Sequence, residues 1–232
     1  MLKCIITALM VTITVNTANA DALHRNPSQP RNALNMKAFG NTSIPIGAYE
    51  YCNRYQVRCQ VSDTTPILNL TKEAWTKIVD INYSVNSEVV PLTDMENFGV
   101  PERWELPGEA GDCEDYVLEK RRKLEQIGIP SGTMRATVVY DADGGGHAVL
   151  TVVTDQGDFI LDNNNNQVLR WQDAELTYLK RQLPGDLTKW ESLQSSWTPA
   201  KTRCFSRAEP VDPELICVWR GFPPYSATSE RF

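Results

Sequence analysis

The sequence predicts an α+β fold, in which helices come first and an antiparallel sheet follows. Residues 112–127 have the apolar spacing of a half-buried helix, and three segments rich in β-branched residues come after it, at 133–140, 147–154 and 159–162. Short segments of turn-forming composition connect these strands, and tight connections join antiparallel neighbours. We therefore expect a helix packed on an antiparallel sheet.

The first twenty residues have the features of a secretory signal peptide. Lys3 precedes an apolar run over residues 5–15, and a small-x-small cleavage site ends at Ala20. The apolar run is about eleven residues long, short of the roughly 20 that a membrane-spanning helix needs. We expect residues 1–20 to be removed, which predicts a periplasmic or secreted protein with no stable membrane insertion; a retained anchor is the alternative.

Removal of the signal peptide leaves 212 of the 232 residues (232 − 20), enough for one domain with its own core. We expect this domain to cover residues 21–195. Residues 196–232 contain Pro, Arg and Trp together with two cysteines, and predict a C-terminal extension. The formal net charge of −6 offers no basic stripe for phosphates, which argues against a nucleic-acid partner.

The cysteine count predicts one free thiol. One of the six cysteines lies in the signal peptide, and the remaining five cannot all pair within one chain in an oxidising compartment. Cys52 and Cys59 are close in sequence, as are Cys204 and Cys217, so two local disulfides are the economical pairing. Cys113 is then left free, and an ordinary buried thiol is the alternative to a functional one.

Two regions outside the predicted sheet complete the outline. Thr71 is a plausible N-cap for a half-buried helix, because apolar residues follow it at helical spacing. Residues 95–111 contain two glycine and two proline positions besides Gly111 and predict a loop, a kind of segment that often holds binding residues. Residues 172–190 could form a further helix.

The helix over 112–127 is predicted in more detail. Asp112 is its expected N-cap, Gly128 lies just past its end, and cations at 120–123 are expected on the face opposite the apolar one. The apolar face comprises Tyr116, Val117, Leu124 and Ile127.

Cys113 is predicted to stand at the first turn of this helix. The positive end of the helix dipole favours a thiolate there, and a thiolate is the form that attacks a carbonyl. The unpaired N–H groups of the same helix end could stabilise an oxyanion. The position of Cys113 therefore indicates a nucleophile for acyl transfer.

His147 and Asp162 are the candidate partners of this thiol. His24 lies in the unpatterned leader, so an imidazole base would have to be His147, which follows three glycines; a histidine packed on the core is the alternative. Asp162 ends the next strand and could orient the imidazole. A symmetric turn at 155–158 would place Asp162 opposite Thr151, so a bulge or an asymmetric loop is needed to bring it nearer to His147.

The carboxylates beside the thiol require an explanation, because Asp112, Glu114 and Asp115 raise the pKa of a neighbouring thiol and oppose the thiolate. N-capping by Asp112 and a first-turn position for Asp115 explain two of them without a ligand. Bound Ca²⁺, which takes oxygen ligands, is the other explanation.

These residues together resemble a known family, the bacterial transglutaminase-like cysteine proteinases, of which LapG-type periplasmic proteases are members. The resemblance covers roughly residues 70–172. It is carried by Trp104, Pro107, Gly111-Asp112-Cys113-Glu114-Asp115-Tyr116, Lys120-Arg121-Arg122, His147-Ala148-Val149-Leu150 and Leu161-Asp162-Asn163.

The resemblance implies a papain/transglutaminase-like fold with Cys113, His147 and Asp162 as catalytic triad. It implies calcium on Asp112 and Glu114, although the chemistry itself requires no cofactor. It also implies a protein or peptide substrate, which in relatives of this kind is a large surface adhesin. The expected function is an exported thiol hydrolase acting on an envelope or surface protein.

Two other classes of function use the same residues. A transglutaminase would transfer the acyl group to an amine, and a peptidoglycan amidase would act on cell-wall peptides, both with this triad. A non-catalytic module could instead keep the fold and use its cleft to bind a peptide. Trp104 could line that cleft or simply pack in the core.

Overall fold

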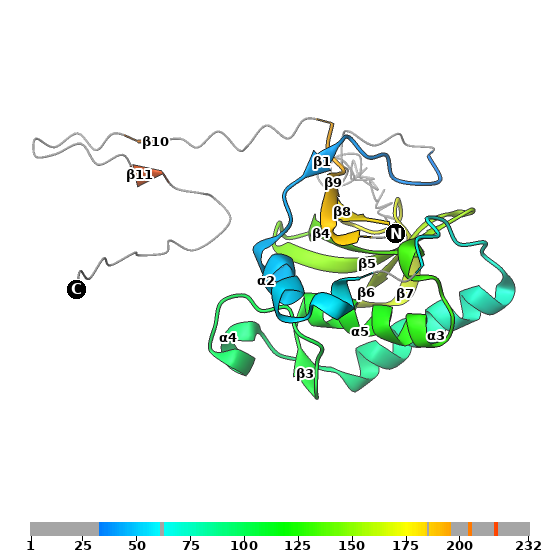
Figure 1. Ribbon diagram of the computed structural model, residues 1–232, viewed down its shortest axis with the longest axis horizontal. Helices are drawn as coiled ribbons and strands as arrows, with labels where there is room; N and C mark the ends of the chain where they lie inside the picture. The colour runs from blue at the N-terminus through cyan, green and yellow to red at the C-terminus, as the bar shows by residue number, and fades with distance from the viewer. Residues whose placement is uncertain (1–32, 61–62, 185, 196–203, 206–215, 218–232) are drawn as a thin grey trace, which may run out of the picture.

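The predicted α+β architecture is confirmed: helices cover one face of an antiparallel sheet (Figure 1). The computed structural model describes residues 33–60, 63–184, 186–195, 204–205 and 216–217. The seven sheet strands are ordered β1-β9-β8-β4-β5-β6-β7. Their bounds are β1 Asn41–Thr42, β4 Met134–Tyr140, β5 Gly146–Thr154, β6 Gly157–Asp162, β7 Asn165–Arg170, β8 Thr177–Leu183 and β9 Asp186–Ser192.

Helices α3 and α5 pack beside each other against the sheet, α5 mainly on β5 and α3 on β7, while α2 lies near β9 (Figure 1). Their bounds are α2 Ile46–Arg54, α3 Lys72–Glu88, α4 Asp94–Phe98 and α5 Cys113–Gln126, with short 3₁₀ turns at Gln56–Cys59 and Ser131–Thr133. Among the described residues, none of the helices has the length and apolarity that crossing a bilayer requires.

The disulfide between Cys52 and Cys59 is confirmed and ties the end of α2 to the following 3₁₀ turn. Strands β10 (Cys204–Phe205) and β11 (Ile216–Cys217) pair so that Cys204 stands opposite Cys217. The side chains of this second predicted pair lie outside the described residues. The same holds for the predicted signal peptide and for most of the extension over 196–232.

The caps predicted for the two long helices are only partly confirmed. Thr71 caps α3 as expected, since its hydroxyl accepts the Ala74 N–H at 3.1 Å. Gly128 follows α5 with φ +89°, a value that favours glycine. Asp112 occupies the N-cap position of α5 but makes no side-chain capping hydrogen bond. The interpretation of Asp112 as a capping side chain is therefore wrong.

The predicted polar face of α5 is also wrong. Lys120 and Arg121 are buried, while Ile127, expected on the apolar face, is 37% exposed. The reason is that α5 contacts the sheet on one side and α3 on the other, so it has two covered faces rather than one. Arg121 is accommodated by hydrogen bonds to Gln182 and to the Ser131 carbonyl oxygen, each at 3.2 Å.

Two other segments differ from the prediction. Residues 95–111 are not all loop: a Thr93–Glu96 capping box starts α4, and β3 (Ala110–Gly111) pairs in parallel with β2 (Val90–Pro91). Residues 172–190 form most of β8 and β9 rather than a helix. The sequence Pro184-Gly185 divides the second segment, and a helix could not have continued through it.

The register of β5 and β6 decides where Asp162 lies. Strand β6 begins at Gly157, two residues earlier than predicted, and Thr154 pairs with Gly157. Leu161 consequently pairs with Leu150, and Asp162 comes two residues closer to His147 along β5 than a symmetric turn at 155–158 would place it. The connection is a two-residue turn and the described β5–β6 pairing has no bulge, so the predicted alternatives of a bulge or an asymmetric loop are both wrong: β6 simply begins earlier.

The sheet face away from α3 and α5 holds a buried ion network. Arg181 donates to Asp158 at 2.9 Å and to Glu191 at 2.7 Å, and Arg135 donates to Glu191 at 3.1 Å. The backbone N–H of Met36 also donates to Asp158, at 2.9 Å. All four charged side chains are buried, so each charge depends on the others for compensation.

Removing Arg181 should strongly destabilise the fold. Arg181→Ala leaves the buried carboxylates of Asp158 and Glu191 with too little positive charge, and we expect the free energy of unfolding to fall by about 3–5 kcal/mol. Lys189, whose side chain is 69% exposed, pairs with Asp186 at the surface, so Lys189→Ala is the control and should cost less than about 1 kcal/mol. Urea unfolding of both variants measures the difference, and similar losses would contradict this account.

Candidate active site

The thiol of Cys113 lies at the start of α5, as predicted. Strand β3 ends at Gly111, Asp112 follows, and Cys113 is the first helical residue. A side chain at position 111 would collide with the carboxylate of Asp115, so glycine lets the strand approach the helix closely. Among the described cysteines, Cys113 is the free one, as the cysteine count predicted.

The surroundings of the thiol oppose its ionisation. Burial raises the pKa of Cys113 well above its usual value, and the negative charge of Glu114 acts in the same direction. The Cys113 thiol donates to Glu114 Oε2 at 3.1 Å. The Ala148 N–H acts in the opposite direction, through a hydrogen bond to the sulfur that favours the thiolate. Burial and the neighbouring carboxylates together thus outweigh the Ala148 hydrogen bond.

His147 and Asp162 are brought together by the sheet. His147 Nε2 lies 2.9 Å from Asp162 Oδ1, and both side chains are largely buried. The same Asp162 oxygen accepts the Asn164 N–H at 2.9 Å. Burial alone would raise the pKa of Asp162, but the hydrogen bond and charge of His147 outweigh it and lower the pKa. Because Nε2 faces Asp162, Nδ1 is the ring nitrogen left for another partner.

The thiol lies against the first residues of β5. Cys113 contacts the Ala148 N–H, and Ala148 is the residue directly after His147. The start of α5 and the beginning of β5 are therefore adjacent.

Three carboxylates gather beside the thiol: Asp94, Asp112 and Glu114 each offer an oxygen, and these oxygens lie within 4.8 Å of one another. Asp112 and Glu114 were predicted, whereas Asp94 was missed. The Thr93–Glu96 capping pattern could have marked a helix start at Asp94, but the parallel β2–β3 pairing that brings α4 to Asp112 has no sequence signal.

The backbone explains part of this arrangement. The Asp94 N–H donates to Asp112 Oδ2 at 3.3 Å, and the Glu105 N–H donates to Asp115 Oδ1 at 2.8 Å. Asp115 thus holds the loop before α5. The interpretation of Asp115 as simply a first-turn carboxylate is incomplete.

The carboxylates are poorly compensated. Burial, followed by the charge of Asp112, raises the pKa of Asp94 to about 6. Burial, followed by the charge of Glu102, raises the pKa of Glu114 to about 9. Asp94 Oδ1 and Asp112 Oδ1 are buried and have no hydrogen-bond partner. Unpaired buried oxygens around one point fit a hard cation such as Ca²⁺, which takes oxygen ligands.

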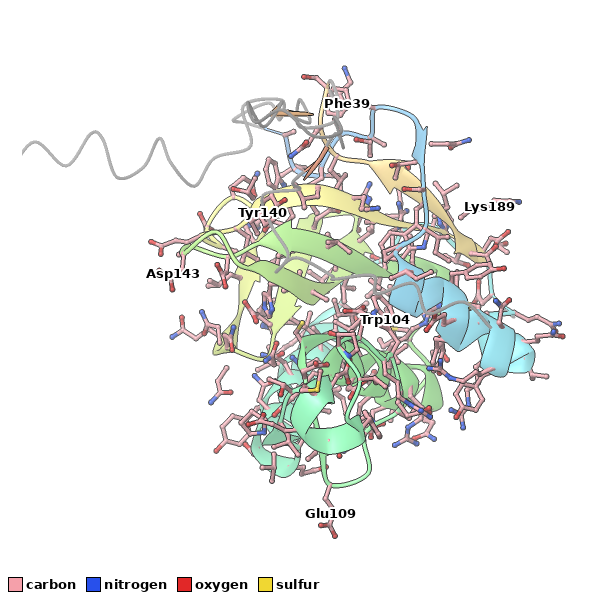
Figure 2. All side chains as sticks on the ribbon, turned by 90° about the vertical axis from the view of Figure 1, so that its left-hand side faces the viewer. Phe39, Trp104, Glu109, Tyr140, Asp143 and Lys189 are labelled. Carbon is pink, nitrogen blue, oxygen red and sulfur yellow. A yellow bond between two sulfur atoms is a disulfide. The ribbon has the colours of Figure 1, made fainter. Side chains whose placement is uncertain are left out.

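Trp104 is a core residue in this structure. Its side chain is buried and reaches toward the middle of the molecule beside α2 (Figure 2). It packs edge-on against Trp190, with ring centroids 6.3 Å apart, and its Nε1 donates to Glu102 Oε1 at 2.9 Å. The packing interpretation of Trp104 therefore holds.

Lys120 lies seven residues after Cys113 on α5, about two turns along the helix. It is 1% exposed, and its Nζ lies 5.9 Å from the centre of the Tyr116 ring. Burial lowers the pKa of Lys120 to about 7, while the charge of Asp162 acts in the opposite direction. One helix thus carries both the free thiol and a buried amine whose charge acts on Asp162.

Comparison with known proteins gives a family match and several similar structures. The family described as "Bacterial transglutaminase-like cysteine proteinase BTLCP" matches residues 38–197, which is 160 of 232 residues (197 − 38 + 1). Calcium-bound LapG of Legionella pneumophila is 22% identical with a TM-score of 0.41, over 46% of this chain and 64% of that chain. The EGTA-treated form is 23% identical with a TM-score of 0.41, over 47% and 62%. The match thus spans less than two thirds of the LapG chains, and no curated protein matches.

The burial of Lys120 predicts a pH dependence of stability. Its pKa is about 7 in the folded chain against 10.5 ordinarily, so the unfolded chain binds more protons between these pH values. Lys120 therefore makes stability rise with pH over this window, by at most about 1.4 kcal/mol per pH unit. Lys120→Met should remove this contribution and stabilise the chain most below pH 7.

Unfolding in urea at pH 6, 8 and 10 measures this effect. Lys123→Met is the matched control, because Lys123 lies on the same helix and pairs with Glu88 near the surface. The control should keep the wild-type dependence on pH. An equal slope in Lys120→Met and wild type would show that Lys120 is not held neutral by the fold.

Proposed function

The chain belongs to the bacterial transglutaminase-like cysteine proteinases, and from that membership we propose that it is an exported thiol protease with Cys113 as nucleophile, His147 as base and Asp162 as orienter. The observation that supports this most directly is the 2.9 Å contact of His147 Nε2 with Asp162, together with a free thiol that is hydrogen-bonded by the backbone N–H of the next residue, Ala148. The proposed substrate is an envelope or surface protein, with a surface adhesin as one candidate.

In the proposed reaction, His147 Nδ1 takes the proton from Cys113 as the sulfur attacks the carbonyl carbon of a peptide or amide bond. The N–H groups at the start of α5 stabilise the oxyanion. The C–N bond then breaks, and the leaving amine receives the proton from His147. Water, deprotonated by His147, attacks the thioester, and the sulfur leaves with a proton to give the free acid and the thiol.

Asp162 has the orienting role in this scheme. Its hydrogen bond to Nε2 fixes the tautomer in which Nε2 carries the proton and Nδ1 is available to accept one. Its negative charge stabilises the imidazolium that forms when His147 takes the thiol proton. The lowered pKa of Asp162 means that this charge is present at neutral pH.

We also propose that Asp94, Asp112 and Glu114 hold Ca²⁺. Bound there, the cation would supply the positive charge that these buried carboxylates lack. Glu114 contacts the thiol directly, so compensation of its charge would remove one of the influences that raise the pKa of Cys113. One support is that Asp94 Oδ1 and Asp112 Oδ1 are buried without a hydrogen-bond partner. The other is the family resemblance from which Asp112 and Glu114 were predicted as ligands.

A periplasmic location completes the proposal. The signal peptide predicted over residues 1–20 is one support. The second is the Cys52–Cys59 disulfide, because structural disulfides form in oxidising compartments such as the periplasm.

Substitution of the nucleophile tests the enzyme proposal. Cys113→Ala should lower proteolysis by at least about 10³-fold, because no other group in the site can form the thioester. The double variant Cys52→Ala/Cys59→Ala keeps Cys113 while removing the disulfide, and should remain active while folded. The measurement is mass spectrometry of new N-termini in envelope proteins incubated with each variant.

Parallel incubations separate the rival functions. Labelled amine donors would be incorporated by a transglutaminase, and muropeptides would be cleaved by an amidase. If the chain cleaves neither proteins nor muropeptides, transfers no amine and has an unreactive Cys113, a binding module is the function that remains.

Calcium binding is tested without reference to activity. Ca²⁺ at about one hundred times its dissociation constant should stabilise the chain by about 2.7 kcal/mol. Asp94→Asn should abolish this gain because it removes a carboxylate from the site. Asp143→Asn changes an exposed carboxylate on the β4–β5 hairpin (Figure 2) and should leave the gain intact. Thermal unfolding with and without EGTA, and calorimetric titration with CaCl₂, measure the effect; no calcium-dependent stabilisation would contradict the assignment.

A further inference from the structure

Asp162 stands at the edge of a turn that has no apolar anchor. It pairs with Asn165 in the β6–β7 hairpin, and residues 163–166 are all asparagine. The pairing of the two strands shifts register between Ile160 and Asp162, so the regular ladder is interrupted just before the turn. Burial of apolar side chains therefore does not fix the position of this turn.

Helix α3 supplies the missing anchor through two side-chain amides. Asn86 Nδ2 donates to the Asp162 carbonyl oxygen at 2.9 Å and to the Asn165 carbonyl oxygen at 3.3 Å. Asn82 Nδ2 donates to the carbonyl oxygens of Asn165 and Asn166, each at 3.1 Å. The two asparagines are one helical turn apart, so both face the same hairpin.

The position of Asn82 indicates a specific requirement for its amide. It is 0% exposed and lies on the stripe of α3 that otherwise buries Ala74, Ile78 and Val85. An apolar residue would suit such a position better, because burying an amide costs free energy unless its groups are hydrogen-bonded. The Asn82 oxygen has no partner, so the donor side of the amide must account for its presence.

We infer that Asn82 and Asn86 are positioning residues for His147: they hold the Asp162 turn on α3, and Asp162 in turn holds the imidazole. The inference rests on the proposed function only in giving that imidazole a catalytic role. Neither asparagine touches the thiol or the substrate carbonyl in the proposed reaction.

The chain of contacts from α3 to the imidazole is continuous. Asn86 fixes the backbone of Asp162, the Asn164 N–H fixes its Oδ1, and the same Oδ1 meets His147 Nε2. The groups whose charges act on Asp162 are His147 and Lys120, both from other elements. Without the two amides the turn would lose the five hydrogen bonds that Asn82 and Asn86 donate to it, and Asp162 could move away from the imidazole.

Asn86→Ala is the variant that tests this inference. We expect kcat to fall about tenfold while KM changes less than about twofold, because substrate binding is not altered. Asn82→Ala should have the same signature. Ser87→Ala is the matched control: Ser87 neighbours Asn86, but its hydroxyl bonds only the Tyr83 carbonyl oxygen of its own helix. The control should keep the wild-type kcat.

A second readout is independent of proteolysis. In ¹⁵N NMR spectra, the imidazole of His147 should show the Nε2-protonated tautomer in the wild-type chain and a mixture of tautomers in Asn86→Ala. The chain has two histidines, so assignment is simple. Measured in a Cys113→Ala background, the tautomer remains informative even if the chain proves not to be a protease, which separates the failure of this inference from the failure of the proposed function.

Each outcome decides the inference. A wild-type tautomer and a wild-type kcat in Asn86→Ala would overturn it, as would an equal loss of kcat in Ser87→Ala. If Asn86→Ala does not fold, hydrogen exchange of the wild-type side-chain amides decides instead. Those of Asn82 and Asn86 should exchange at least about tenfold more slowly than that of exposed Asn164, and equal rates would reject the clamp.

Discussion

Helix α5 is confined on two sides, by the sheet and by α3, and the rest of the site depends on this confinement. A helix covered on one face could present Cys113 in several orientations. Here Tyr116 bonds the Val89 carbonyl oxygen at 2.6 Å, and Arg121 bonds the sheet through Gln182. These two contacts on opposite sides fix the rotation of the helix. The start of α5 is thereby held against the first residues of β5.

The same confinement explains why the site holds buried charges that are poorly compensated. Residues that would be solvated on an ordinary surface helix are enclosed, so carboxylates gather at one end of α5 and an amine lies two turns away. The amine is too far along the helix to be a member of the carboxylate cluster. The carboxylate cluster therefore favours a bound cation or protons. Its charges raise the pKa of Cys113 rather than lower it, so the helix start does not hold a preformed thiolate in this state.

The sequence was informative where local chemistry decides the structure. Strand composition located β4 to β6, the cysteine count singled out Cys113, and Asp162 was predicted as the partner that His147 contacts. Prediction failed where packing decides. The burial of Lys120 follows from a second covered face of α5, and Asp94 joins Asp112 through a pairing of distant two-residue strands. Neither the burial of Lys120 nor the approach of Asp94 to Asp112 produces a periodicity or spacing in the sequence from which it could be predicted.

The ion network on the far face of the sheet has a consequence for how the chain acquires its fold. It joins the backbone of Met36 to side chains at 135, 158, 181 and 191, and the edge strand β1 pairs with β9. The ion network and the β1–β9 pairing thus each join the beginning of the described domain to its later part. During synthesis, Met36 and β1 are made long before their partners, Asp158 and β9. This side of the molecule can therefore form only after nearly the whole domain has been synthesised.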